Sequence, residues 1–179
     1  MRVRGISVKV ENTRPDIQTA FVLERLDAAL GLIEQYQPWR LAHLRRDVAY
    51  IWIKAFPCRG AYLPDPRVVL TELSFLARAA EFTPAIIASS ILHEGVHARV
   101  ARVVRRPRDP AREERLCRRA ELAFGLTLPP DLGAPVIERA VASLGLDDAD
   151  VAPAIDWAAA HAAKASADAK AIAAWRSRS

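Results

Sequence analysis

Residues 84–104 read PAIIASSILHEGVHARVARVV, and this stretch decides the fold. Thr83 and Pro84 form a typical helix start, because the threonine hydroxyl can cap the first turn and proline suits the first helical position. The residues that precede HEGVH are mostly apolar, which is typical of a helix that packs into a core. We therefore expect one helix from Pro84 to about Val104, with residues 93–97 well away from both ends.

The centre of this helix carries the pattern H-E-x-x-H at His93, Glu94 and His97. The two histidines are four residues apart, so both imidazoles project from one helical face and can share a metal ion. Two imidazoles and a carboxylate suit Zn²⁺, which then keeps a fourth position for water, and Glu94 can reach that water as a general base. The pattern therefore predicts a zinc-dependent hydrolase. The alternative is two histidines on the surface of an amphipathic helix.

A third metal ligand has to come from another segment. A second helix is expected over 110–125, with an aspartate cap before its first proline and a glycine at its end. This helix carries Glu113, Glu114 and Glu121, and Glu114 follows His97 by enough residues for a loop and a helical turn to return it to the metal. We expect Glu114 to be the third ligand, with Glu113 as the alternative. Glu113 or Glu121 could instead pair with neighbouring arginines on a solvated face.

An H-E-x-x-H helix, a loop and a glutamate-bearing helix together resemble the gluzincins, the thermolysin-like zinc peptidases, in their small single-domain forms. The resemblance covers about Asp47 to Gly125. HEGVHAR followed by E-x-x-C-x-x-x-E-x-x-F is also similar to a family of small bacterial zinc-peptidase-like proteins without an assigned substrate. The resemblance implies a zincin-like α+β fold and a zinc metallopeptidase. It further implies a set of site residues: ligands His93, His97 and Glu114, with Glu94 as the base.

One feature departs from the gluzincin pattern. In thermolysin-type sites an aspartate four positions after the third ligand orients a zinc-bound histidine. Position 118 is arginine here, and position 117, the equivalent if Glu113 were the ligand, is cysteine. Glu121, one turn further along the helix, could take this orienting role.

The rest of the chain predicts an α+β domain over 1–145 and an Ala-rich helical tail over 146–179. Alternating apolar residues indicate strands over 6–10 and 47–56, and VVLTEL at 68–73 indicates a third. The short Pro/Gly-rich segment between the last two predicts an antiparallel pair, with 68–73 at the sheet edge. Further helices are expected in three segments: from the Thr13–Asp16 capping box to about Tyr36, over Pro135–Leu144, and from about Asp150 onward.

A peptide substrate would add alongside an edge strand that lies within Gly60 to Thr71, through main-chain hydrogen bonds. Tyr62 could donate a hydrogen bond to an oxyanion, although a tyrosine in such a place more often packs. His161 is a second candidate for the same role. Peptide or protein substrate is thus the expected partner.

Composition excludes several other classes of protein. Of the 179 residues 26% are charged and 51% apolar, which excludes a disordered chain. The longest apolar stretch, Pro84–Leu92, is less than half a membrane span. Cys58 and Cys117 form no C-x-x-C pair, which excludes a disulfide scaffold and indicates a reducing cytosol, and we expect both to be small core residues. MRVRGISVKVEN contains no apolar signal core, so a cytoplasmic protein is expected.

The net charge is +5, and the excess is almost entirely arginine. Arg99, Arg102 and Arg106 lie along one side of the motif helix and could dock nucleic acid or an acidic protein. The chain has no aromatic interleaving and no recognition-helix pattern, so a solvated face is favoured. Nearby acids would balance that face: Asp109, Glu113 and Glu114. The alternative function is a non-catalytic module that holds zinc or binds nucleic acid or protein.

Overall fold

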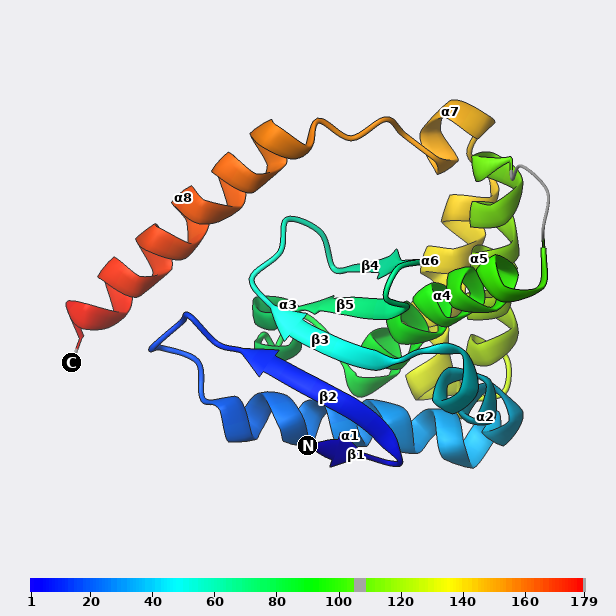
Figure 1. The fold of residues 1–179 in the computed structure, drawn as a ribbon, viewed down its shortest axis with the longest axis horizontal. Helices are drawn as coiled ribbons and strands as arrows, with labels where there is room; N and C mark the ends of the chain where they lie inside the picture. The colour runs from blue at the N-terminus through cyan, green and yellow to red at the C-terminus, as the bar shows by residue number, and fades with distance from the viewer. Residues whose placement is uncertain (105–108, 179) are drawn as a thin grey trace.

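Five strands form one mixed sheet in the order β1-β2-β3-β5-β4, and helices cover it (Figure 1). The computed structural model describes residues 1–104 and 109–178. The strands are β1 (Arg2–Val3), β2 (Ile6–Glu11), β3 (Tyr50–Lys54), β4 (Gly60–Leu63) and β5 (Val68–Glu72). The helices are α1 (Thr19–Tyr36), α2 (Pro38–Asp47), α3 (Leu73–Ala77), α4 (Pro84–Val103), α5 (Pro110–Gly125), α6 (Pro130–Leu144), α7 (Asp148–Val151) and α8 (Trp157–Arg176). The expected α+β class is confirmed.

The order of the strands differs from the one that the sequence predicts. β3 and β5 pair in parallel, with Tyr50 opposite Val68, so the predicted antiparallel pair is wrong. The segment interpreted as a turn contains β4, which pairs antiparallel with β5 on its far side. β5 therefore lies inside the sheet, and all five of its residues are buried. The edge strand is β4, which does fall within Gly60–Thr71, and Pro64 and Pro66 belong to the turn that follows it.

Two N-terminal helices replace the single one expected from the Thr13–Asp16 pattern. α1 begins only at Thr19, because the Asn12 side chain holds the preceding loop through hydrogen bonds to the backbone of Arg14 and Ile17. The predicted end near Tyr36 is correct, but Pro38 occupies the first position of a further helix, α2, which was not predicted. The missed helix matters, because it packs against α4.

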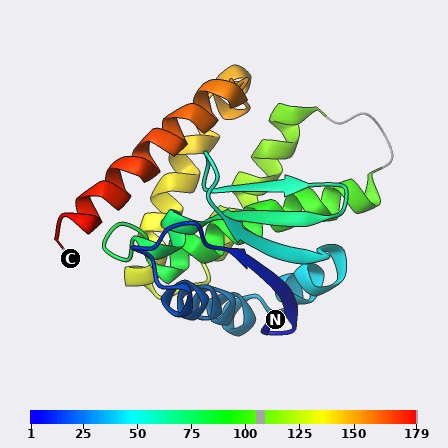
Figure 2. The ribbon, with the colours of Figure 1, turned by 60° about the vertical axis from the view of Figure 1, so that its left-hand side comes forward.

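The helix that carries the motif is confirmed from Pro84 to Val103, and the Thr83 hydroxyl accepts a hydrogen bond from the Ile86 amide at 3.3 Å. α4 contacts four helices and two strands, α1, α2, α5, α6, β4 and β5, and it lies at the centre of the molecule (Figure 2). Gly95 permits this packing on one side, because a Cβ there would lie 2.6 Å from Cδ2 of Leu44 on α2. The buried position of α4 holds the H-E-x-x-H residues on a rigid support.

The C-terminal helices differ from the prediction in two places. The helix expected from about Asp150 onward begins only at Trp157, because the short α7 ends at Val151 and residues 152–156 are not helical. α6 begins at Pro130 instead of Pro135, since Gly133 lets its first turn approach the end of α5: a Cβ at Gly133 would lie 2.3 Å from the carbonyl oxygen of Gly125. α8 forms an outer arm (Figure 1) and has no buried residue. Ion pairs attach α8 to the body, among them Lys164 to Glu72 at 3.0 Å. Within the described ranges, none of the helices combines the length and apolar character that a membrane span requires.

Candidate metal centre

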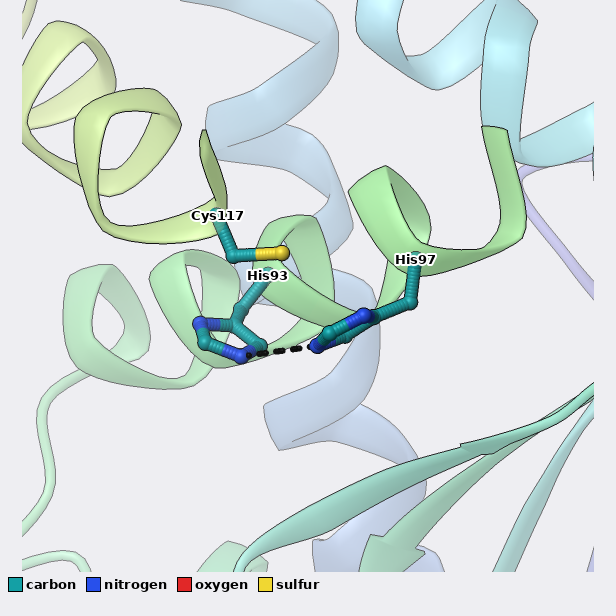
Figure 3. A group of neighbouring side chains, drawn as sticks. All are labelled: His93, His97 and Cys117. Carbon is teal, nitrogen blue, oxygen red and sulfur yellow. Dashed lines mark hydrogen bonds between the residues drawn. The ribbon is translucent and has the colours of Figure 1, made fainter. Parts of the chain in front are cut away.

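The two histidines of the motif lie side by side on one face of α4 (Figure 3). His93 is buried and His97 is half-buried, and their Nε2 atoms are 3.2 Å apart. α4 brings them together because residues four apart on a helix are one turn apart on the same face. The paired arrangement that the sequence predicts is therefore present, and the alternative of two surface histidines is wrong.

Glu114 of α5 faces both of these nitrogens. Its Oε2 is 3.1 Å from Nε2 of His93, and its Oε1 is 3.1 Å from Nε2 of His97. Donor atoms held at about 2.0–2.1 Å on a tetrahedral zinc ion would lie roughly 3.3–3.4 Å apart. Two nitrogens and a carboxylate thus already stand at nearly the separations that such an ion requires.

The outer nitrogen of each ring contacts a second carboxylate. Nδ1 of His93 is 2.6 Å from Oε1 of Glu121, and Nδ1 of His97 is 2.7 Å from Oε1 of Glu113. A carboxylate accepts a hydrogen bond, so each Nδ1 carries a proton, and in a neutral ring Nε2 then holds the lone pair. With neutral rings, two lone pairs and the Glu114 carboxylate converge on one point, where either added protons or a metal cation relieves their repulsion. The donor set therefore fits a divalent metal ion.

Glu113 and Glu121 are assigned by these contacts. Glu113 faces the outer side of His97, whereas Glu114 faces the space between the rings. Glu121 occupies the orienting position suggested for it in the sequence, on His93. It is fully buried, so its interpretation as a solvated surface acid is wrong, although Arg118 does pair with it at 2.7 Å.

Buried Glu121 is the centre of a polar network. Its Oε2 accepts a hydrogen bond from Oγ of Ser89 at 2.9 Å, and Arg139 of α6 lies 3.6 Å from the same oxygen. Burial raises the pKa of Glu121, but His93, Arg118 and Arg139 more than offset that effect, so the pKa lies below its ordinary value. The carboxylate is thus held in its ionised form under His93.

In the absence of an ion, the histidines hold protons strongly. Burial by itself lowers the pKa of His93. The hydrogen bonds to Glu114 and Glu121 raise this pKa by more than burial lowers it, and the result is about 10. The pKa of His97 rises to about 9 by the same balance, with Glu114 the largest favourable contact. The two histidines hold the pKa of Glu114 well below its usual range against the effect of burial. Protons in this site therefore compete with any metal ion.

Glu94 lies against the edge strand β4. It is buried, and burial raises its pKa above the ordinary value. A Cβ at Gly60 of β4 would lie 3.1 Å from Oε1 of Glu94, so the backbone of β4 passes directly over this carboxylate. A buried carboxylate of raised pKa is suited to accept and release a proton.

Cys117 of α5 is a further ligand-type side chain near the histidines (Figure 3). Its Sγ and the ring nitrogens of His93 and His97 lie within 4.8 Å of one another. Burial raises the pKa of this thiol to about 12, whereas Glu114 is ionised and lies at 3.1 Å from both rings. Glu114 is therefore the better third donor. The expectation of a small core residue holds for fully buried Cys117 but not for Cys58, which is half-buried and lines the cavity.

A cavity of about 930 Å³ opens beside the histidines. β4 borders it through Gly60 and Tyr62, and residues 151–157 supply an apolar wall. Tyr62 lines the cavity and also packs against the hydrophobic core, so its oxyanion role stays a prediction. His161 instead packs edge-on to Phe56 with their ring centroids 5.8 Å apart, and it does not line this cavity. Three arginines line the cavity although no sequence motif marks them as site residues: Arg59, Arg118 and Arg139.

Two arginines of α4, Arg99 and Arg102, pair with an aspartate of α2. Arg102 lies 3.1 Å and Arg99 3.6 Å from carboxylate oxygens of Asp47, which is buried at the end of α2. For Arg99 and Arg102 the predicted balance by Asp109, Glu113 and Glu114 is wrong, because both arginines pair with Asp47 instead. Arg106 lies outside the described residues.

Comparisons of this chain with protein-family models, with curated proteins and with solved structures find no match. The site therefore has to be interpreted from its own geometry.

Proposed function

We propose that this protein is a zinc-dependent hydrolase with a zincin-like fold and that its reaction is the cleavage of peptide bonds. The observation that carries the proposal is the convergence of three donors, the Nε2 atoms of His93 and His97 and the carboxylate of Glu114, at 3.1–3.2 Å from one another. A surface histidine pair would need neither the third donor nor the two carboxylates behind the rings. Metal sites commonly use such outer carboxylates to fix the tautomer and orientation of their histidines.

The residues of the chain divide the chemistry between them. A bound zinc ion supplies a water molecule of lowered pKa and polarises a carbonyl oxygen. Glu94 takes a proton from the attacking water at a carboxylate oxygen and passes it to the amide nitrogen of the leaving peptide, which completes the addition of water across the amide. Its burial keeps bulk water away from this proton. Glu113 and Glu121 keep both Nδ1 atoms protonated, so that both Nε2 atoms stay available.

The position of β4 supports a peptide as substrate. Among the described strands, β4 pairs only with β5, so its other side presents main-chain donors and acceptors next to the cavity. An extended peptide could add there as a further strand. Its scissile amide would then lie close to Glu94, because Gly60 of this strand contacts Glu94.

The test combines metal content with hydrolysis. We expect purified protein to bind one equivalent of zinc and His97→Ala to lose it, because a single imidazole and a carboxylate hold zinc poorly. Glu94→Gln should keep the zinc but lose about 10² or more in hydrolysis of a peptide library, since an amide cannot accept the proton. Glu24→Gln, an exposed change on α1, is the matched control and should keep both. A full zinc equivalent in His97→Ala, or full activity in Glu94→Gln, would contradict the proposal.

A further inference from the structure

Three arginines are among the residues that line the cavity beside the candidate metal centre. Arg118 comes from α5, Arg139 from α6 and Arg59 from the segment before β4, and all three line the cavity. Arg118 and Arg139 approach opposite oxygens of the same buried Glu121, at 2.7 and 3.6 Å. Arg59 lies further out, with its guanidinium 4.9 Å from the centre of the Phe82 ring. One wall of the cavity is therefore cationic.

The carboxylates beside these arginines already pair with other groups. Arg118 and Arg139 share Glu121, which also contacts His93, whereas Glu113 and Glu114 contact the histidines. Neither guanidinium therefore has a carboxylate of its own, and an anionic group from outside would pair with them.

The arginines also have unused hydrogen-bonding capacity. Within the described part of the chain, Nη1 of Arg139 and Nε of Arg118 are buried without a hydrogen-bond partner. The pKa of Arg139 lies below its ordinary value, mainly because the side chain is buried. The Glu121 carboxylate raises this pKa, whereas the positive charges of Arg59 and Arg118 lower it. Buried donors of this kind are normally paired, and a planar guanidinium matches the two oxygens of a carboxylate.

We propose that the site takes substrates that carry a carboxylate close to the scissile bond, and that Arg139, together with Arg118, binds this carboxylate. This inference rests on the proposed peptidase function and names its substrate class. Arg139 is a specificity-determining residue, whereas Arg118 also holds Glu121 in place. The carboxylate comes either from the C-terminus of a peptide or from an acidic side chain.

An apolar part of the cavity lining restricts what accompanies the carboxylate. Val151, Pro153, Ile155 and Trp157 line it, and Trp157 packs on Phe56 with ring centroids 5.8 Å apart. An apolar side chain beside the carboxylate would contact this wall and lose its hydration. Phenylalanine next to the anionic group is therefore a suitable probe.

Binding to zinc-loaded Glu94→Gln protein tests the inference without turnover. Three probes are titrated by calorimetry: acetyl-Ala-Phe with a free carboxylate, acetyl-Ala-Phe-amide and acetyl-Glu-Phe-amide. We expect at least one carboxylate-bearing probe to bind about tenfold more tightly than acetyl-Ala-Phe-amide, since a charge-assisted contact adds this much affinity. The free-terminus probe and the glutamate probe distinguish the two sources of the carboxylate.

Variants made in the same Glu94→Gln background identify the residue that binds the carboxylate. Arg139→Met should abolish the preference, and Arg139→Lys should retain part of it, because lysine keeps the charge without the two-pronged geometry. Arg112→Met, on α5 but outside the cavity lining, is the matched control and should keep the preference. Zinc content and far-ultraviolet circular dichroism of each variant confirm that the site and fold are intact.

The outcomes separate this inference from the proposed function. Equal binding of all three probes to zinc-loaded protein, or an unchanged preference in both folded Arg139 variants, overturns the carboxylate site. If the preference depends on Arg139 but wild-type protein hydrolyses no peptide, the carboxylate site stands as a binding site and the peptidase proposal fails.

Discussion

Replacing Glu121 with glutamine tests whether the buried carboxylate behind His93 supports metal binding. The amide oxygen of glutamine can still accept the hydrogen bond from Nδ1, so the ring stays in place. The negative charge is lost, however, and with it the electrostatic support of an imidazole that lies 2.6 Å away. Loss of such an outer partner typically weakens metal binding by about 10- to 100-fold, or roughly 1.4–2.7 kcal/mol.

The same change also leaves Arg118 and Arg139 facing a neutral group. Removing one partner of a buried ion pair costs about 3–5 kcal/mol when both charges are fully buried. Arg118 and Arg139 are 20% and 27% exposed in their side chains, so the cost here should fall below that range. We therefore expect Glu121→Gln to lower the free energy of unfolding by less than 3 kcal/mol and to remain folded at 25 °C.

Competition with a chromophoric zinc chelator measures the affinity, and urea unfolding of the metal-free protein measures the stability. Glu138→Gln, an exposed change on α6, is the control and should alter neither. Zinc affinity that is unchanged in folded Glu121→Gln protein would refute the orienting role of the carboxylate. Glu121→Gln protein that is unfolded at 25 °C would instead contradict the expected stability loss of less than about 3 kcal/mol.

Three further predictions concern the neighbourhood of the site. Gly60→Ala should keep zinc but reduce hydrolysis by about tenfold, because the new Cβ would lie 3.1 Å from Oε1 of Glu94 and displace it; full activity would contradict the contact. Gly95→Ala should destabilise the protein by about 1 kcal/mol in urea unfolding, since a clash with Leu44 that costs about 1–3 kcal/mol outweighs a helix-propensity gain of about 1 kcal/mol. Zinc affinity should rise between pH 6 and 8 with release of protons, because the ion-free pKa values of about 10 and about 9 mean that protons occupy the site histidines below those values. Calorimetry in buffers of different ionisation enthalpy measures this release, and its absence would contradict the raised pKa values.

The sequence specified the motif helix well because local signals determine it. A threonine cap, a proline in the first turn and apolar residues before the histidines place α4 almost to the residue. Similar signals at Asp109 and Pro110 define the start of α5. Helical spacing alone then predicts that His93 and His97 share a face.

The arrangement of the strands could not be predicted in the same way. Whether β5 pairs in parallel with β3 depends on where β4 lies, and β4 is a strand of four half-buried residues with no strong alternation. α2 was missed because Pro38 both ends one helix and begins the next. These choices depend on packing between segments that are distant in sequence.

The role of each glutamate on α5 also could not be predicted without the three-dimensional structure. Glu113 and Glu114 are adjacent in sequence, and the rotation of α5 about its own axis decides which one faces the Nε2 atoms. Arg139 reaches the same site from α6, and its sequence neighbourhood gives no sign of this. Sequence spacing limits which residues can reach the histidines, but the packing of the helices decides which of them do so.

The metal donors and the candidate base Glu94 rely on contacts that span different lengths of the chain. His93, His97 and Glu114 come from two consecutive helices, so contacts that are local in sequence can assemble the donor set early in folding. Glu94 instead reaches its final environment only when β4, more than thirty residues earlier, has joined the sheet over it. A chain that has paired its helices but not closed its sheet could therefore capture a metal ion before it could use one, and premature hydrolysis by a partly folded chain would be prevented.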